Sequence, residues 1–486
     1  MKRRSRMLLA VLGTVGILTP LAILWQTSRV PATLSVLDMG YADHGRAAEP
    51  GHSGHGGPTA RAMDSLIADP SGKADVVVEL EAAASTLTVG GHPVAGFTLN
   101  GSSPGPTIEA TEGDLVEVRL RNASVSAGVA LHWHGLDVPN AMDGVAGVTQ
   151  DAVPVGEVFT YRFVAEQKGT YWYHSHQVSH EQVVGGLFGA IVIAPAKPDR
   201  RVRDVLIASH AYGGIKTLNG QPGDLSLPAR EGEVVRLRVI NTDNGPIEVW
   251  ADTAYKILAV DGTDVHEPGE VEDASVTVTA GGRVDLGLTV PSGGIPARVQ
   301  VSKGTAVILG DGDLPPEPRQ PPRAVDLLSY GQAQPLAFDP AQADRTFDYT
   351  IGRRPGFVRG KPGLWWSING NLYPNVPMFM VRDDDVVVMR IENRSGEVHP
   401  MHLHGHHAVV LAHNGVRATG SPWWFDSLNV RNKETYDIAF VADNPGIWMD
   451  HCHNLQHAAD GMVAHLMYEG VSTPYVLGGT PDNQPE

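Results

Sequence analysis

The clearest pattern along the chain is an alternation of apolar and polar side chains that occurs three times. It covers residues 115–122 (LVEVRLRN), 234–241 (VVRLRVIN) and 386–393 (VVVMRIEN). Alternation with a period of two is typical of a β-strand that buries one face. An Asn-Gly pair, typical of a tight turn, precedes each segment by about fifteen residues. The repeat predicts three similar β-domains and an all-β fold.

The domain boundaries follow from the composition between these repeats. Residues 314–322 (LPPEPRQPP) are rich in proline and are typical of a linker. We therefore expect β-domains at residues 73–196, 197–313 and 325–478. Residues 28–72 are rich in Gly, Pro, Ala and Ser and predict a flexible linker. Its scattered histidines, which include His44, His52 and His55, fit a polar linker better than a copper-gathering segment.

The N-terminal segment differs from the rest of the chain. Four basic residues among the first six precede an uncharged apolar run from Met7 to Trp25. This run is close to the roughly 20 residues that a membrane span needs, and it is long for the core of a signal peptide. We expect residues 1–27 to be a retained membrane anchor, with cleavage and secretion as the alternative. In both cases the remaining chain works outside the cytoplasm.

Composition narrows the range of partners. The chain has 486 residues with 55 Gly and 35 Pro, which suits several β-domains joined by many turns. Its net charge of −17 argues against nucleic acid as a partner. Cys452 is the only cysteine, so the chain can form no internal disulfide.

The single cysteine stands in the segment with the most specific chemistry. His451 and His453 flank Cys452, His457 follows, and Met462 comes five residues later. A thiolate, imidazoles and a thioether form the ligand set of a blue copper electron-transfer site. Alternate side chains of a strand face opposite sides, so Cys452 faces one way and its two neighbours face the other. One strand is therefore predicted to reach two metal sites that Cys452 joins covalently.

Histidines also occur in pairs separated by one residue, and each pair puts two imidazoles on one face of a strand. The four pairs are His132 and His134, His174 and His176, His402 and His404, and His451 and His453. Eight imidazoles are too many for one metal ion, so they indicate a cluster of several copper ions.

The first and third predicted domains repeat the same motif in register. Residues 169–176 match residues 446–453 at equal spacing. The first domain has Val129, Ser175, His180 and Gly185 at the positions of His399, Cys452, His457 and Met462. It is therefore predicted to keep its cluster histidines and to lack a blue site. The second domain has no histidine pair in residues 244–250, so we expect no copper there and a cluster at the interface of domains 1 and 3.

Residues 75–475, with all four pairs in order, resemble the multicopper oxidases, the family of laccases and bacterial copper-tolerance oxidases. The resemblance implies three cupredoxin-like Greek-key β-sandwich domains and four copper ions per chain. The implied ligands of the type 1 copper are His399, Cys452, His457 and Met462. Those of the type 2 copper are His132 and His402, and those of the type 3 pair are His134, His174, His176, His404, His451 and His453. Electrons would arrive at the type 1 site, pass through Cys452 and reduce dioxygen to water at the cluster.

Three further positions are interpreted through the resemblance. Asp143 follows the first histidine pair, where the family has a carboxylate that supplies protons; an aspartate before a glycine is also common in turns. The family often has a second carboxylate directly after the second type 1 histidine, but this chain has Ala458 there. Asp426 would lie near the type 1 site, where it could hold a cationic donor.

These observations predict a laccase-like enzyme that couples one-electron oxidation of a phenolic or metal-ion donor to four-electron reduction of dioxygen to water. The alternatives are a cuprous oxidase in copper tolerance and a ferroxidase, although the 12 Met form no methionine-rich insert. Copper nitrite reductase fits less well, because it usually has two domains and a wider spacing between its cysteine and the following histidine. A non-catalytic copper-binding protein would have no use for eight cluster histidines.

Overall fold

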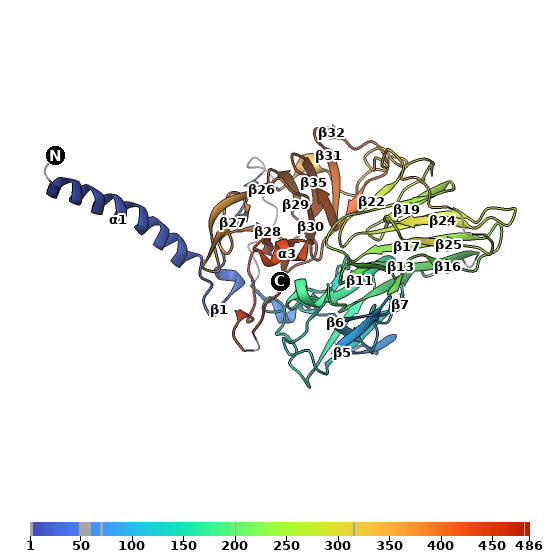
Figure 1. The fold of residues 1–486 in the computed structure, drawn as a ribbon, viewed down its shortest axis with the longest axis horizontal. Helices are drawn as coiled ribbons and strands as arrows, with labels where there is room; N and C mark the ends of the chain where they lie inside the picture. The colour runs from blue at the N-terminus through green and yellow to red at the C-terminus, as the bar shows by residue number, and fades with distance from the viewer. Residues whose placement is uncertain (1–2, 48–59, 69–70, 200, 314–315, 481) are drawn as a thin grey trace.

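The computed structural model describes residues 3–47, 60–68, 71–199, 201–313, 316–480 and 482–486. Strands dominate these residues and form three pairs of β-sheets that follow one another along the chain (Figure 1). A long apolar helix, α1 (Arg3–Thr27), precedes them. The structure thus confirms the predicted all-β architecture after an N-terminal hydrophobic segment.

The first pair of sheets carries two of the four histidine pairs. Its sheets have the strand orders β10-β8-β5-β6 and β7-β12-β11-β9. The strands are β5 (Val76–Val89), β6 (His92–Leu99), β7 (Ile108–Thr111), β8 (Leu115–Asn122), β9 (Leu131–His134), β10 (Val158–Val164), β11 (Gly169–Ser175) and β12 (Phe188–Ala194). Alternate apolar residues of both sheets, such as Leu120 and Ile191, form one buried core between them.

The second pair of sheets has no histidine pair. Its longer sheet has the order β15-β14-β13-β17-β23-β19-β20, with β21 beside β19, and its shorter sheet has the order β16-β25-β24-β18-β22. The strands are β13 (Val202–Tyr212), β14 (Ile215–Leu218), β15 (Gln221–Pro222), β16 (Leu225–Leu227), β17 (Val234–Asn241), β18 (Ile247–Ala251), β19 (Tyr255–Val260), β20 (Thr263–Asp264), β21 (Glu270–Val271), β22 (Val276–Val278), β23 (Arg283–Thr289), β24 (Ala297–Val301) and β25 (Ala306–Leu309).

The third pair holds the other two histidine pairs and the cysteine. Its sheets have the orders β2-β28-β37-β36-β30-β34 and β27-β26-β29-β35-β31-β32, with β3 beside β26 and β33 beside β31. The strands are β2 (Tyr41–Asp43), β3 (Arg46–Ala47), β26 (Arg345–Val358), β27 (Lys361–Ile368), β28 (Pro377–Val381), β29 (Val386–Asn393), β30 (His399–Leu403), β31 (Ala408–His413), β32 (Val416–Arg417), β33 (Trp424–Phe425), β34 (Ser427–Val430), β35 (Thr435–Val441), β36 (Ile447–Cys452) and β37 (Val463–Tyr468).

The asparagines of the three Asn-Gly turns have the same role in each pair of sheets. Asn100, Asn219 and Asn369 have positive φ angles of 52°, 51° and 51°. Asparagine adopts this left-handed conformation more readily than most residues. Each side-chain amide also bonds two main-chain groups of the preceding long strand, β5, β13 or β26. The turn is thereby fixed against its own sheet.

The asparagines that end the repeated strands explain the second half of the repeat. Asn122, Asn241 and Asn393 are 0% exposed, and each amide nitrogen donates to carbonyl oxygens of adjacent loops and strand ends. A buried amide without partners would be costly, so these residues hold loops where they enter the sandwich. The asparagine at the end of each repeated segment therefore has the same structural role in all three pairs of sheets.

The segment expected to be a flexible linker differs from that expectation. Short strands β1 (Thr33–Leu34) and β4 (Arg61–Ala62) pair with β39 (Leu477–Gly478) and β38 (Val471–Ser472), while β2 and β3 join the third pair of sheets. Val36, Met39 and Met63 are at most 1% exposed in the core of that pair. Burial of these apolar side chains offsets the conformational entropy that a flexible segment would keep. His52 and His55 lie outside the described residues.

Helix α1 projects away from the rest of the molecule (Figure 1). Its segment Met7–Thr27 has 21 residues, a mean hydropathy of 2.3 and no buried residue in its most apolar window. A helix of this length can cross the hydrocarbon layer of a membrane. The N-terminal apolar helix therefore fits either a signal segment or an anchor.

Candidate metal centres

Neighbouring strands bring the histidine pairs together. In the first pair of sheets, His174 of β11 lies opposite His132 of β9. In the third pair, His451 of β36 lies opposite His402 of β30, and Cys452 lies opposite Met401. The strands expected from the spacing of the histidines are therefore present, and each carries its imidazoles at one end.

The eight paired histidines meet between the first and third pairs of sheets and form what we call the histidine cluster. His132 Nε2 lies 3.4 Å from His402 Nε2, and His404 Nε2 lies 3.2 Å from His451 Nε2. The His134 and His402 rings stack with their centroids 3.7 Å apart. The His453 ring lies 4.8 Å from that of His134. Imidazoles from two distant parts of the chain thus alternate around one small volume.

Three subsets of the cluster have nitrogens close enough to share a metal ion. In each subset the candidate ligand atoms lie within 4.8 Å of one another. The subsets are His132, His402 and His404; His132, His134 and His174; and His176, His404 and His451. His453 belongs to none of these subsets, although its ring is in the cluster. Copper ions held by shared histidines would fit this arrangement.

Burial determines the charge state of the cluster. Burial first, and neighbouring imidazoles second, hold the pKa of six rings well below the usual histidine value: His134, His174, His176, His402, His404 and His453. These rings are neutral near pH 7 and offer a lone pair to a metal ion. Nitrogens of His134, His174, His176 and His453 are buried and have no hydrogen-bond partner among the residues that the structure describes. Buried polar atoms without partners are rare, and bound copper would satisfy them.

Asp143 lies between the two halves of the cluster. It is 1% exposed, its Oδ1 lies 3.0 Å from His132 Nδ1, and its Oδ2 lies 3.1 Å from His404 Nδ1. Its main-chain oxygen also lies 2.9 Å from His132 Nδ1. One carboxylate thus orients a histidine from each half and leaves both Nε2 atoms facing the other imidazoles. This is the usual arrangement around a metal-binding histidine.

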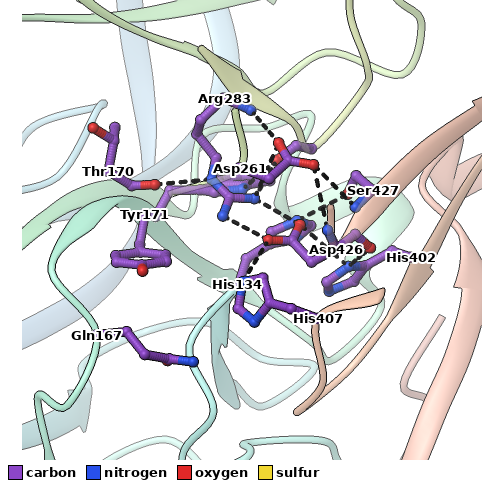
Figure 2. A network of polar contacts seen from close by, with 12 residues as sticks. His134, Gln167, Thr170, Tyr171, Asp261, Arg283, His402, His407, Asp426 and Ser427 are labelled. Carbon is purple, nitrogen blue, oxygen red and sulfur yellow. Dashed lines mark hydrogen bonds and ion pairs between the residues drawn. The ribbon is translucent and has the colours of Figure 1, made fainter. Parts of the chain in front are cut away.

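Asp426 lies against the histidine cluster. This corrects the expectation that it lies near the type 1 site and holds a donor. It is 1% exposed, its Oδ1 lies 3.1 Å from His134 Nε2, and its main-chain oxygen lies 2.8 Å from His402 Nδ1. Figure 2 shows both carboxylate oxygens facing the guanidinium of Arg283. The two charge-assisted bonds are each 2.6 Å long. A carboxylate enclosed in this way cannot reach a donor at the surface.

Arg283 shows that the second pair of sheets takes part in the site. It comes from β23, is fully buried, and also donates to the main-chain oxygen of Thr170 at 3.0 Å. Asp261 accepts from the Arg283 main-chain nitrogen at 2.8 Å, and burial next to Asp426 raises the pKa of Asp261 to about 7. No histidine pattern marks Arg283, so sequence reasoning missed it.

Glu486 is a second residue that sequence reasoning missed. Its side chain is buried, with Oε1 3.0 Å from His451 Nδ1 and 3.9 Å from His176 Nε2. Ser179, in the short helix α2 (Ser179–Gln182), donates to Oε2 at 2.7 Å. Glu486 therefore holds His451 as Asp143 holds His132 and His404. Its distance along the sequence from any histidine motif gives no signal for this role.

The cysteine lies in a separate group, which we call the cysteine site: His399, Cys452 and His457. Cys452 Sγ lies 3.6 Å from His399 Nδ1 and 3.7 Å from His457 Nδ1, and the two nitrogens are 3.2 Å apart. Met462 is 0% exposed and packs in the same core cluster as Cys452. Burial raises the pKa of the Cys452 thiol, so a thiolate here needs a bound cation.

The outer edges of the two cysteine-site histidines differ. His399 is 0% exposed, and its Nε2 lies 2.7 Å from Ser395 Oγ. His457 Nε2 lies 3.3 Å from Asn454 Nδ2 and 3.5 Å from Glu397 Oε2, and the His457 side chain is 12% exposed. His457 is therefore the histidine through which the cysteine site meets the surface.

The positions that match the cysteine site in the first pair of sheets hold no such group. Val129 is 0% exposed in the apolar core, and Ser175 Oγ bonds Gln182 Oε1 at 2.6 Å. His180 is partly exposed. A Cβ at Gly185 would lie 2.7 Å from the Phe97 ring and 2.9 Å from the Glu181 oxygen. No side chain as large as methionine fits there.

Comparison with known proteins gives the same picture. Two family models, both described as multicopper oxidase, match residues 81–198 and 338–470 and together cover more than half of the chain. Multicopper oxidase MmcO of Mycobacterium tuberculosis is 27% identical, with 88% of this chain and 94% of that protein covered. Laccase-2 of Botryotinia fuckeliana is 27% identical, with 79% and 80% covered.

The fold is also found among solved structures. The crystal structure of a multicopper oxidase from Pseudomonas thermotolerans matches with a TM-score of 0.68 and 26% identity, covering 81% of this chain and all of that one. The match confirms the predicted cupredoxin-like sandwiches. The family uses copper at type 1, type 2 and type 3 sites, and the cysteine site and the histidine cluster are consistent with such sites. The chain belongs to the multicopper oxidase family, whose members are copper-dependent oxidoreductases.

Proposed function

We propose that this protein is a laccase-like oxidase that takes single electrons from an organic donor and reduces dioxygen to water. The main observation behind this proposal is the strand that ends at Cys452, because this strand links the cysteine site to the histidine cluster. Copper, when bound, supplies reversible one-electron chemistry at both places. Four electrons and four protons convert one dioxygen to two waters.

The proposed ligand roles follow the resemblance and are supported by the geometry. The cysteine site, with Met462 as a weak axial ligand, would hold the type 1 copper, since thiolate, two imidazoles and a thioether suit it. His132 and His402, whose Nε2 atoms are 3.4 Å apart, would hold the type 2 copper. The type 3 pair would be held by His134, His174, His176, His404, His451 and His453.

The three pairs of sheets support the proposed domains at residues 73–196, 197–313 and 325–478. In this arrangement the second domain binds no copper and contributes Arg283 to the support of the cluster. The polar residues around the cluster orient it: Asp143 and Glu486 bind Nδ1 atoms, so the Nε2 atoms face inward.

Asp143 is also proposed to supply protons to dioxygen. Its carboxylate is buried among cluster histidines, where solvent protons arrive slowly. Asp143→Asn should leave reduction of the type 1 site unchanged and slow reoxidation by dioxygen, most strongly at high pH. Stopped-flow reoxidation of the reduced variant measures this, and a wild-type rate at every pH excludes the relay.

The surface next to His457 favours an organic donor over a metal ion. Glu397 is the carboxylate beside His457 Nε2, but its Oε1 accepts from Arg353 Nη2 at 2.5 Å. The Arg353 guanidinium lies 3.9 Å from the centre of the Trp366 ring, which packs on His457. The cation neutralises Glu397 and lowers its attraction for Fe²⁺ or Cu⁺. A phenol can instead place its hydroxyl at His457 and its ring against this surface.

Oxygen uptake by the copper-loaded protein tests the proposed function. We expect a higher kcat/KM with a phenol than with Cu(I) or Fe(II). Preference for Cu(I) would support the cuprous oxidase alternative, and preference for Fe(II) the ferroxidase alternative. No oxygen uptake with any donor would contradict the proposed activity. Arg353→Gln should raise the rate with the metal ions relative to the phenol, because it frees the Glu397 carboxylate.

We further propose that α1 anchors the enzyme in a membrane, with its catalytic part outside the cytoplasm. The basic first residues favour the cytoplasmic side, and the apolar run Met7–Thr27 is long enough to span the bilayer. Mass spectrometry of the protein isolated from membranes tests this. Recovery of a chain that begins after residue 27 would favour a cleaved signal segment.

A further inference from the structure

The base of α1 is held directly against the β26–β27 hairpin. α1 ends at Thr27, and the next residue, Ser28, is only 4% exposed. The main-chain nitrogen of Gly360, in the turn between β26 and β27, donates to Ser28 Oγ at 3.2 Å. Arg29 lies over the Trp25 ring at 5.1 Å. No long tether separates the helix from the hairpin, so the position of α1 determines what the hairpin turn faces.

This hairpin is basic although the protein is acidic. Between Asp348 and Asp383 the sequence has no Asp or Glu, while the chain as a whole has a net charge of −17. Arg359 and Lys361 lie at the turn, Arg354 lies further along β26, and all three are exposed. Among the described residues, no carboxylate lies at ion-pair distance from these three cations. Arg353, by contrast, is paired with Glu397.

The same turn presents apolar and aromatic side chains to the outside. Leu364 is 61% exposed and Trp25, at the end of α1, is 41% exposed. Trp365 is half-buried, and its Nε1 donates to the Lys361 main-chain oxygen at 3.1 Å. Arg354 donates to the Gly370 main-chain oxygen and Arg359 lies over the Tyr373 ring, and neither charge has a carboxylate partner in the part of the chain that the structure describes. Exposed leucine, tryptophan and such cations together are typical of protein segments at the boundary between lipid and water.

The position of the hairpin relative to α1 would bring its turn close to a bilayer that α1 spans. α1 extends away from the body, and β27 lies at the side of the body where α1 leaves it (Figure 1). A helix that spans the bilayer brings its final residues to the lipid headgroups, and the hairpin turn is bonded to those residues. Cations without a carboxylate partner at that depth are attracted by anionic headgroups.

We propose that the turn of the β26–β27 hairpin, through Arg354, Arg359, Lys361 and Leu364, docks on an anionic phospholipid surface. The docking rests on the proposed anchoring by α1, which brings the turn to the membrane. Trp366 of β27 packs on His399 and His457 with ring centroids 4.7 and 4.4 Å apart. The hairpin that would contact lipid therefore also forms one wall of the cysteine site.

A depth measurement on the full chain tests the proposal. Cys452 is the only cysteine and is 0% exposed, so a surface cysteine can be labelled selectively. Leu364→Cys and the matched control Ile295→Cys, at positions 61% and 60% exposed, would each carry a fluorophore. Ile295 lies just before β24 in the sequence, and β24 is on the side of the body away from α1 (Figure 1). Both proteins would be placed in nanodiscs that contain phosphatidylglycerol and a quencher-labelled lipid.

We expect quenching of the label at Leu364, by about twofold or more, and none at Ile295. Replacing phosphatidylglycerol by phosphatidylcholine should reduce this quenching, and so should the combined change of Arg354, Arg359 and Lys361 to Gln. Incorporation into the discs reports on α1 separately. Incorporated protein without quenching at Leu364, or with equal quenching in both lipids, overturns the docking and leaves the anchor intact. Failure to incorporate overturns the anchor and the docking together.

Discussion

The first and third pairs of sheets contribute equally to the histidine cluster, but only the third has the cysteine site. Ser175 and Cys452 are equivalent residues on equivalent strands, and each lies between two cluster histidines. Ser175 bonds Gln182, whereas Cys452 faces His399 and His457. The comparison shows that core packing and a hydrogen bond occupy, in the first sandwich, the positions that form the cysteine site in the third.

In the proposed function, the difference also limits electrons to one route to the cluster. If both halves had a cysteine site, electrons would have two routes to the cluster. With Val129 and Gly185 at the matching positions, the proposed route passes through Cys452 alone. His457, at the surface end of this route, lies in the short helix α3 (Leu455–Ala459), four residues after His453 of the histidine cluster.

The largest expected effect comes from making the two halves alike. Cys452→Ser gives the third sandwich the residue of the first, and we expect loss of the blue absorption band and of oxidase turnover. Copper at the histidine cluster should remain, because none of its imidazoles is altered. The matched change Ser175→Ala should leave both the spectrum and turnover as they are. Absorption spectra and copper analysis provide the measurement, and a blue band in Cys452→Ser would refute the assignment.

Loss of the second sandwich's contribution should have the next largest effect. Arg283→Met leaves the buried Asp426 carboxylate without its cation, which costs about 3–5 kcal/mol of unfolding free energy. His134 and His402, which contact Asp426, should then bind copper less tightly. Arg201→Met breaks an exposed pair with Asp199 in the same part of the chain and should have no measurable effect. Equal denaturation curves for the two variants would contradict this support role.

Glu486 allows a test within the cluster. Glu486→Leu removes the carboxylate beside His451 and should weaken copper binding at the type 3 pair by about 10- to 100-fold. Glu486→Gln should restore part of the binding, because its side-chain carbonyl can still accept from Nδ1. The blue band should persist in both variants. Titration with copper, followed at the type 3 absorption, measures the effect; identical curves for the Leu variant and the parent would exclude the role.

The smallest expected effect concerns the axial position. Met462→Leu removes a weak donor that favours Cu(II), so the reduction potential of the type 1 copper should rise while the blue colour persists. Gly185, at the matching position of the first sandwich, cannot hold such a side chain. Redox titration of the blue band gives the answer, and an unchanged or lower potential would remove Met462 from the proposed ligands.

Local patterns predicted the parts of the molecule that depend on local structure. The alternating segments and their asparagines predicted three similar sandwiches, because turn geometry and loop anchoring recur in each. The histidine spacing predicted which strand ends carry imidazoles. The described parts of residues 28–72 differ from the flexible linker that their Gly and Pro content suggested, because a few apolar residues, such as Val36 and Met63, insert into the third core.

The residues that support the cluster could not be predicted in the same way. Arg283 and Asp426 are 143 positions apart, and Glu486 reaches a histidine from outside every motif. Their contacts arise only when the three sandwiches pack together. The family resemblance suggested that Asp426 lies near the type 1 site and holds a donor, but packing turns its carboxylate inward to Arg283 and His134.

Copper stoichiometry combined with electron paramagnetic resonance is the most direct test of one cysteine site joined to one shared histidine cluster. The copper-loaded protein should contain four copper ions per chain, with one type 1 signal, one type 2 signal and a coupled pair that gives no signal. Cys452→Ser should contain three and lack the type 1 signal. A wild-type chain that saturates with a single copper ion, or that shows two type 1 signals, would contradict the asymmetric arrangement.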